Sequence, residues 1–216
     1  MTVYFIAGLG ANKRAFDYLD LSWCTPVFID WITPLPRETL VEYALRLRQV
    51  ITEANPVIVG VSFGGMLVTE MAKADGSITA IIISSNKTYK EFPAYLRMWR
   101  HLPVYKLLNP KLVKFTGALS CRIMGPQGIK QKETFRKILS ETDPKFTVWA
   151  IDAILHWHND TIPPNVTHIH GSNDRLLPAK LVKAHHIINK GRHIMIMDKA
   201  DEISSLLKKI LQPKMF

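Results

Sequence analysis

The sequence is poor in cysteine and contains no long apolar run. Its 216 residues include two cysteines, Cys24 and Cys121, which lie far apart and lack the spacing of metal ligands. This scarcity argues against a disulfide framework, and we expect reduced thiols in a cytoplasmic protein. No apolar run approaches the roughly 20 residues that span a bilayer, and no basic segment precedes the apolar start. We therefore expect neither a membrane span nor a signal peptide.

Acidic residues are scarce relative to basic ones. The chain has 28 lysines and arginines against 18 aspartates and glutamates, a formal net charge of +10. Residues 86–160 carry most of this excess, with thirteen basic and six acidic side chains. Such charge serves solubility, or attracts an acidic small molecule, an anionic lipid or a nucleic acid. No nucleic-acid-binding motif accompanies it, so we expect no nucleic-acid partner.

Hydrophobic residues make up 47% of the chain, enough for the core of one folded domain. Short apolar runs, typical of buried strands, alternate with segments of helical spacing. The expected strands cover residues 3–8, 26–30, 56–62, 78–85, 165–171 and 184–191, and the main expected helices cover residues 38–54, 65–74 and 200–211. This alternation predicts an α/β fold with a mostly parallel, six-stranded sheet covered on both faces.

Residues 86–160 interrupt this alternation, because they have helical spacing and no convincing strand. We expect residues 1–85 and 161–216 to form the core, and residues 86–160 to form a helical lid inserted after the fourth strand. One of the lid helices is expected over residues 110–125. Open α/β sheets bind ligands at the carboxyl edge of their strands, where the lid would lie. Its aromatic side chains are candidates to line a substrate pocket, above all Phe92, Trp99 and Trp149.

The stretch VIVGVSFGG, residues 57–65, places Ser62 between Gly60 and Gly64. A strand followed by G-x-S-x-G and a helix is the context of a nucleophile elbow, a turn so tight that flanking side chains would clash. The N–H groups at the start of the helix favour negative charge beside the serine. An ordinary glycine-rich turn is the alternative. The position between a buried strand and a helix favours the nucleophile.

A serine nucleophile needs a base, and the base needs a carboxylate. Of the eight histidines, His193 follows the last strand, so its loop lies at the same sheet edge as Ser62. Asp174 follows the strand that ends at Gly171, which gives the chain order Ser, Asp, His. We expect the backbone N–H groups of Phe63 and Leu9 to form the oxyanion hole.

These segments resemble the α/β-hydrolase superfamily over nearly the whole chain. The resemblance rests on AGLGANKRAF, GVSFGG, HGSNDRLLP and GRHIMIMDKADEIS, in the expected order, and is greatest to small bacterial esterase-like hydrolases. It implies a triad of Ser62, Asp174 and His193, and it implies that the first two strands of the usual sheet are missing. Two positions depart from the family pattern, Ala7 in place of a histidine and Arg192 in place of a small residue.

The expected function is that of a serine hydrolase that cleaves a carboxylic ester or thioester through an acyl-enzyme, with no metal or organic cofactor. Its partner would be a small-molecule ester, and a basic lid would attract an anionic one. An amidase, a C–C bond hydrolase or a cofactor-free haloperoxidase would use the same triad. A binding or receptor protein of this fold, without turnover, is an alternative of a different class. Substrate identity and oligomeric state stay open.

Overall fold

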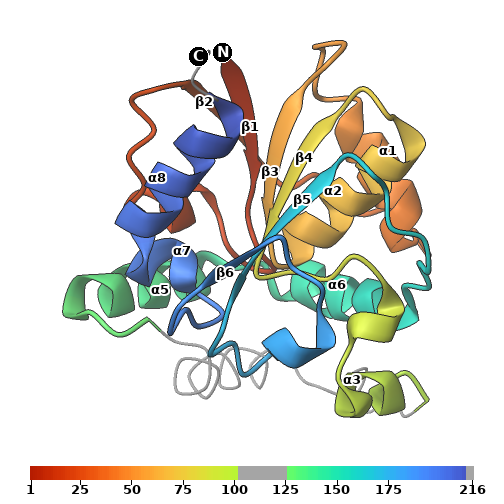
Figure 1. Cartoon of the computed structure of the whole chain (residues 1–216). Coiled ribbons are helices and arrows are strands. Elements are labelled where there is room, and N and C mark those ends of the chain that lie inside the picture. The colour runs from red at the N-terminus through yellow and green to blue at the C-terminus, as the bar shows by residue number, and fades with distance from the viewer. Residues whose placement is uncertain (102–125, 213–216) are drawn as a thin grey trace.

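The computed structural model describes residues 1–101 and 126–212, and its centre is a six-stranded sheet whose neighbouring strands are all parallel (Figure 1). The strand order is β2-β1-β3-β4-β5-β6. The strands are β1 (Thr2–Ile6), β2 (Thr25–Ile29), β3 (Val57–Val61), β4 (Thr79–Ile83), β5 (Val166–Gly171) and β6 (His186–Ile188). The predicted α/β fold with six strands is confirmed, and the sheet is parallel throughout.

Helices cover both faces of this sheet (Figure 1). On one face lie α1 (Leu40–Arg48) and α2 (Phe63–Ala74), which share a hydrophobic core with α6 (Pro144–His156). On the other face lie the 3-10 helix η1 (Lys13–Phe16), α7 (Met195–Asp198) and α8 (Ala200–Leu211). Two more helices, α3 (Ala94–Trp99) and α5 (Ile129–Glu141), lie at the carboxyl edge of the strands, the lower edge in Figure 1.

The alternation of side chains along β1 shows how the sheet joins these layers. Val3 and Phe5 belong to the core shared with η1, α7 and α8, whereas Tyr4 and Ile6 belong to the core shared with α1 and α2. The Phe5 ring lies 5.2 Å from the ring of Phe16 on η1. Because each fully buried side chain of this size contributes about 1.5–3 kcal/mol, both faces of the strand stabilise the fold.

Helix α1 is shorter than the sequence predicts, since it ends at Arg48 and not near residue 54. Its start is well defined: the Thr39 side chain accepts from the Glu42 N–H, and the Glu42 carboxylate accepts from the Thr39 N–H. At its end, the Arg48 guanidinium donates to the carbonyl of Ile51 and turns the chain back. The β-branched residues 50–52 are weak helix formers and do not resist this turn.

Strand β6 is likewise shorter than predicted, with three residues, His186–Ile188, in place of the expected 184–191. Lys190 has a φ of 56°, outside the range of an extended strand, and the Gly191 N–H donates to the carbonyl of Ile188. This turn leads the chain directly into the loop that carries His193.

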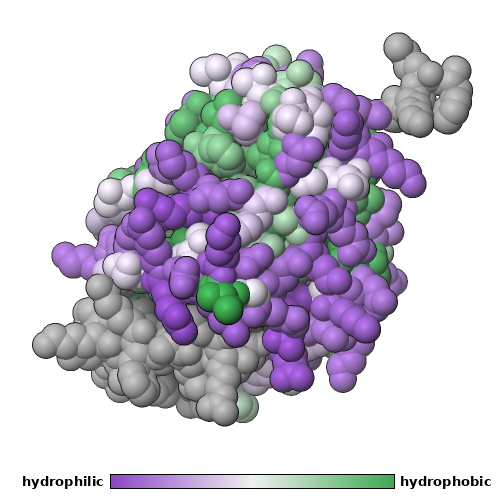
Figure 2. All heavy atoms as spheres, turned by 90° about the vertical axis from the view of Figure 1, so that its left-hand side faces the viewer, coloured by the Kyte–Doolittle hydropathy of each residue, from purple (hydrophilic) through white to green (hydrophobic). Residues whose placement is uncertain are grey.

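Between β4 and β5 the described residues form η2 (Tyr89–Glu91), α3, α5 and α6. The helix predicted over residues 110–125, and with it Cys121, lies outside the described residues. The face of the molecule that carries α8 is covered mainly by hydrophilic side chains (Figure 2). Among the described residues, no helix combines the length and the hydrophobicity needed to cross a membrane.

Candidate active site

Ser62 lies in the sharp turn between β3 and α2, with φ 52° and ψ −116°. A non-glycine residue at positive φ is strained, and such strain is characteristic of functional turns. A Cβ atom on Gly60 would lie 2.5 Å from the carbonyl oxygen of Gly64, and one on Gly64 would overlap the carbonyl oxygen of Ala7. Only glycine fits these two positions, so the G-x-S-x-G pattern has a steric cause.

Two hydrogen bonds hold the backbone of this turn. The Ser62 N–H donates to the carbonyl of Ile83 at the end of β4, at 2.9 Å. The Ser85 hydroxyl donates to the Ser62 carbonyl at 2.7 Å. The Ser62 side chain itself is only half-buried, so its Oγ faces accessible space at the carboxyl edge of the sheet.

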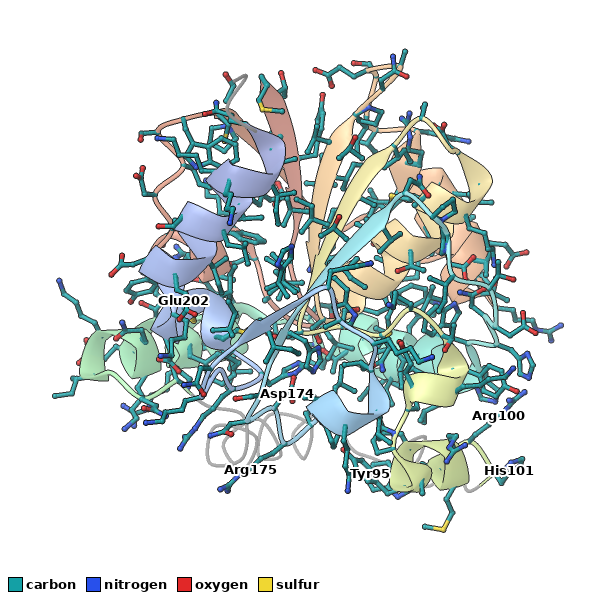
Figure 3. All side chains as sticks on the ribbon, in the orientation of Figure 1. Tyr95, Arg100, His101, Asp174, Arg175 and Glu202 are labelled. Carbon is teal, nitrogen blue, oxygen red and sulfur yellow. The ribbon has the colours of Figure 1, made fainter. Side chains whose placement is uncertain are left out.

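The three residues predicted to act together converge at this edge. Ser62 Oγ lies 2.9 Å from Nε2 of His193, and Nδ1 of His193 lies 2.8 Å from Oδ2 of Asp174. His193 and Asp174 are both buried, at 7% and 5% exposure. They come from the loops that follow β6 and β5, and Figure 3 shows Asp174 below these strands, with Arg175 pointing away from the sheet.

The environment of Asp174 keeps its carboxylate charged. Burial disfavours the charged form, but the neighbouring His193 and hydrogen bonds from His193 and the Leu177 N–H outweigh it, so the pKa of Asp174 lies below its usual value. Its Oδ1 accepts from the N–H groups of Leu176 and Leu177, at 2.9 and 2.8 Å. Its Oδ2 is thereby left to face His193.

The predicted oxyanion donors lie on either side of Ser62. Phe63 is the first residue of α2, so its N–H has no acceptor in a preceding helical turn. On the other side, a Cβ on Gly8 would lie 3.3 Å from Cβ of Ser62, which brings the Leu9 backbone beside the serine. The Leu9 N–H has no hydrogen-bond acceptor within residues 1–101 and 126–212.

The loop that carries Leu9, residues 8–12, is held from several directions. The Ala11 N–H donates to the carbonyl of Gly8 at 2.9 Å, and the Trp31 indole donates to the carbonyl of Ala11 at 2.7 Å. The hydroxyl of Thr142, which directly follows α5, donates to the carbonyl of Gly10 at 2.5 Å. Gly10 has a φ of 70°, a conformation that favours glycine.

A cavity of about 260 Å³ opens beside Ser62 and His193. Its wall is formed by the loop at residues 8–11, by α5 and α6, and by the chain that follows His193. The helices contribute mostly apolar side chains: Phe135, Ile138 and Leu139 from α5, and Thr147 and Ile151 from α6. Among the described lining residues, His193 is the one ionisable group.

The three aromatic residues predicted for the pocket do not line this cavity among the described residues. Phe92 is buried against Trp157, with ring centroids 5.8 Å apart. Trp99 lies on α3 with half of its surface exposed. The Trp149 indole donates to the carbonyl of Glu38, so its ring packs beside α1. Trp149 lies two residues from Thr147 and from Ile151, hence on a different side of α6.

The sequence contained a signal for the actual wall. Phe135, Ile138, Leu139 and Thr142 are spaced i, i+3, i+4 and i+7, which predicts one face of a helix; the first three lie on α5, and Thr142 directly follows it. The prediction from aromatic residues missed this wall, because only Phe135 among the four is aromatic.

Comparison with known proteins shows the family and the fold of this chain. A sequence model described as the alpha/beta hydrolase family matches residues 3–206. The chain belongs to the alpha/beta hydrolase family. The family resemblance and the fold class predicted from the sequence are therefore confirmed. A search of curated protein sequences found no match to this alpha/beta hydrolase.

Solved structures resemble this alpha/beta hydrolase over nearly its full length. A thermophilic esterase from Thermogutta terrifontis, solved with malate bound, has a TM-score of 0.78 at 12% identity, covering 98% of this chain and 89% of that one. An esterase from Exiguobacterium antarcticum has a TM-score of 0.74 at 13% identity, covering 98% and 92%. A lipase-esterase related protein from Clostridium acetobutylicum has a TM-score of 0.71 at 17% identity, covering 96% and 93%. At these identities the likeness is one of fold.

Proposed function

We propose that this protein is a serine hydrolase that cleaves a carboxylic ester or thioester through an acyl-enzyme. The observation that supports the proposal best is the continuous line of contacts from Ser62 through His193 to Asp174, at 2.9 and 2.8 Å. Hydrogen-bond reach from nucleophile to base, and from base to an orienting carboxylate, is the signature of an activated serine. The proposal includes a cytoplasmic location, supported by the low cysteine content.

The first half of the reaction follows from the proton positions. Asp174 accepts the proton of His193 Nδ1, which leaves a lone pair on Nε2 facing the Ser62 hydroxyl. His193 takes the hydroxyl proton as Ser62 Oγ forms a bond to the carbonyl carbon, and the carbonyl oxygen becomes an oxyanion. The N–H groups of Leu9 and Phe63 stabilise this oxyanion, and Asp174 stabilises the protonated imidazole.

The second half returns the enzyme to its starting state. The tetrahedral intermediate collapses, His193 donates its proton to the departing alcohol or thiol, and the acyl group stays on Ser62. A water molecule then gives a proton to His193 and attacks the acyl-enzyme. A second collapse releases the carboxylic acid, and the proton returns to Ser62.

The cavity favours an uncharged, apolar acyl group. Its described lining offers no cation to an anionic substrate, whereas apolar side chains of α5, α6 and the segment after His193, including α7, surround the free space. The lysines of α5, Lys130, Lys132 and Lys137, are exposed and do not line it. A volume of about 260 Å³ lies just below the usual range of small-molecule sites, about 300–1,000 Å³, so we infer a short or medium acyl chain.

A fluorophosphonate probe tests this function against the alternative of a binding protein without turnover, because only an activated serine reacts with it. We expect the wild type to be labelled and to hydrolyse p-nitrophenyl esters. Ser62→Ala should fold normally, escape labelling and lose several orders of magnitude in kcat. A Ser205→Ala variant, which removes an exposed serine of α8, is the control and should be labelled like the wild type. Labelling that persists in Ser62→Ala, or a wild type that binds esters without hydrolysing them, contradicts the proposal.

A further inference from the structure

Two histidines that take no part in the proposed reaction lie directly behind the triad carboxylate. His168 and His170 are two residues apart on β5, so their side chains project from the same face of the sheet. Both are fully buried. His168 Nε2 lies 3.0 Å from His170 Nδ1, and His170 Nε2 lies 2.7 Å from the carbonyl oxygen of Leu177 and 3.5 Å from Asp174 Oδ2.

These contacts fix the positions of the protons. The Leu177 carbonyl can only accept, so Nε2 of His170 carries a proton. In a neutral ring Nδ1 is then an acceptor, and it receives the Nε2 proton of His168. Burial lowers the pKa of both rings, that of His168 to about 2, and both are therefore neutral. The donors thus run in one direction, from His168 through His170 to Leu177.

Leu177 belongs to the turn that holds Asp174. Its N–H donates to Oδ1 of Asp174 at 2.8 Å, and its carbonyl accepts from His170. Since both groups flank the same Cα atom, a shift of the carbonyl also displaces the N–H. The direction of the Asp174 carboxylate, and hence the contact of its Oδ2 with His193, depends on where Leu177 lies.

We infer that His170 is a positioning residue of the active site, which holds the Leu177 carbonyl and thereby keeps Asp174 aligned with His193, while His168 holds the ring of His170. The inference rests on the proposed function of Asp174. It gives a role to two buried polar side chains that would otherwise cost stability in the core.

A second side chain binds the same turn from outside and serves as a comparison. Tyr95 on α3 donates its hydroxyl proton to the carbonyl of Leu176 at 2.7 Å. Figure 3 shows Tyr95 and Asp174 at the same edge of the sheet. Tyr95 is 41% exposed, so water can replace its hydrogen bond, whereas no water reaches the fully buried His170. Both side chains donate a hydrogen bond to a carbonyl of this turn. When the side chain is replaced, water can take the place of Tyr95 but not that of the buried His170.

A pair of substitutions of equal length separates the hydrogen bond from the packing. His170→Gln retains an N–H donor near the position of Nε2, and His170→Met has the same length without a donor. Tyr95→Phe is the matched control. Four quantities are measured: kcat and KM for a p-nitrophenyl ester, the rate of fluorophosphonate labelling, the pH profile of kcat/KM, and the low-field proton signal of His193 Nδ1–H.

We expect His170→Met to lower kcat and the labelling rate at least about 10-fold, short of the ~10⁴-fold loss seen when a triad carboxylate itself is replaced. KM should change little. The low-field signal of His193 should weaken in His170→Met and persist in His170→Gln and Tyr95→Phe. His170→Gln should regain most of the activity. If the Met variant does not fold, His168→Met, which leaves the contact between His170 and Leu177, should show the same changes at about threefold.

The pH profile distinguishes positioning from a purely electrostatic effect. The titratable groups around His170 are His168, Glu91, Asp174 and His193. If His170 positions Asp174, its loss weakens the stabilisation of the His193 imidazolium, and the acid limb of kcat/KM moves to lower pH. A move to higher pH would show instead that His170 only withdraws charge from Asp174, and would overturn the inference.

Two further results would also overturn it: a His170→Met variant with the labelling rate and low-field signal of the wild type, or a His170→Gln variant as impaired as His170→Met. The nuclear magnetic resonance signal needs no substrate. A wild type with a low-field signal but without labelling or hydrolysis would refute the proposed function while leaving the positioning of Asp174 intact.

Discussion

The contact between Thr142 and the loop that carries Leu9 gives a prediction whose size follows from the structure. The Thr142 hydroxyl donates to the carbonyl of Gly10, next to the proposed oxyanion donor Leu9. Substitution by valine preserves the shape of the side chain and removes the donor. The Gly10 carbonyl then loses its partner from the end of α5, and the loop is held less firmly beside Ser62.

Two bounds set the expected loss. Complete loss of one oxyanion donor costs about 10²–10³ in kcat. The loop at residues 8–12 keeps its other hydrogen bonds, from Ala11 to Gly8 and from Trp31 to Ala11, and Asn12 still donates to Glu141 at 2.9 Å. The displacement of Leu9 should therefore be partial. We expect kcat for Thr142→Val to fall about 10-fold, or about 1.4 kcal/mol of transition-state stabilisation, with KM nearly unchanged.

The assay compares kcat for a p-nitrophenyl ester in Thr142→Val and Thr134→Val. Thr134 also lies on α5 and makes a 2.8 Å hydrogen bond to the Tyr18 hydroxyl, but it does not touch the loop at residues 8–12. Thr134→Val should retain the wild-type kcat. Equal losses in both variants would trace the effect to loosening of α5 as a whole. Wild-type kcat in Thr142→Val would refute the reasoning.

Two other predictions concern the cavity and the buried histidines. In a series of p-nitrophenyl esters from acetate to dodecanoate, kcat/KM should rise about fourfold per methylene, since burying each contributes about 0.8 kcal/mol, and fall once the cavity is full; Ile151→Trp should move the optimum to shorter chains. The pKa of His168 is about 2 in the folded protein and about 6.5 in the unfolded chain. Between these two pH values the unfolded chain binds a proton at His168 and the native protein does not. The free energy of unfolding, measured in urea, should drop by about 2 kcal/mol between pH 7 and pH 5 from this residue alone, and less in His168→Gln.

The fold and the convergence of Ser62, Asp174 and His193 could be predicted because each depends on a local rule. The tight turn at Ser62 requires glycine at positions 60 and 64, and the structure shows the overlaps that a side chain would create there. Parallel strands end at one edge, so loops that follow β3, β5 and β6 meet there whatever the details of packing. The position of His193 after the last strand, and the chain order Ser, Asp, His, then led to the prediction of His193 as the base and Asp174 as its carboxylate partner.

The cavity wall and the ends of α1 and β6 could not be predicted, because they depend on contacts between distant segments. Arg48 ends α1 by donating to the carbonyl of Ile51, and the spacing of apolar residues does not predict this hydrogen bond. Which side of α6 faces Ser62 depends on how the helix rotates over α1, and the hydrogen bond from Trp149 to Glu38 favours a rotation that turns the indole away. The prediction of Phe92, Trp99 and Trp149 for the pocket was based on residue type, which does not indicate the direction of a side chain.

Helix α5 both lines the cavity and contacts the loop that carries Leu9. Its apolar face forms a wall of the cavity, and the residues at its end, Glu141 and Thr142, bind the loop beside Ser62. An acyl group that fills the cavity would therefore contact the helix whose end holds the loop of the proposed oxyanion donor Leu9. We expect an acyl chain that fits the cavity to raise kcat as well as lower KM, because filling the cavity holds Leu9 in place. In Thr142→Val this link is weakened to the contact between Glu141 and Asn12, so kcat should depend less on chain length than in the wild type.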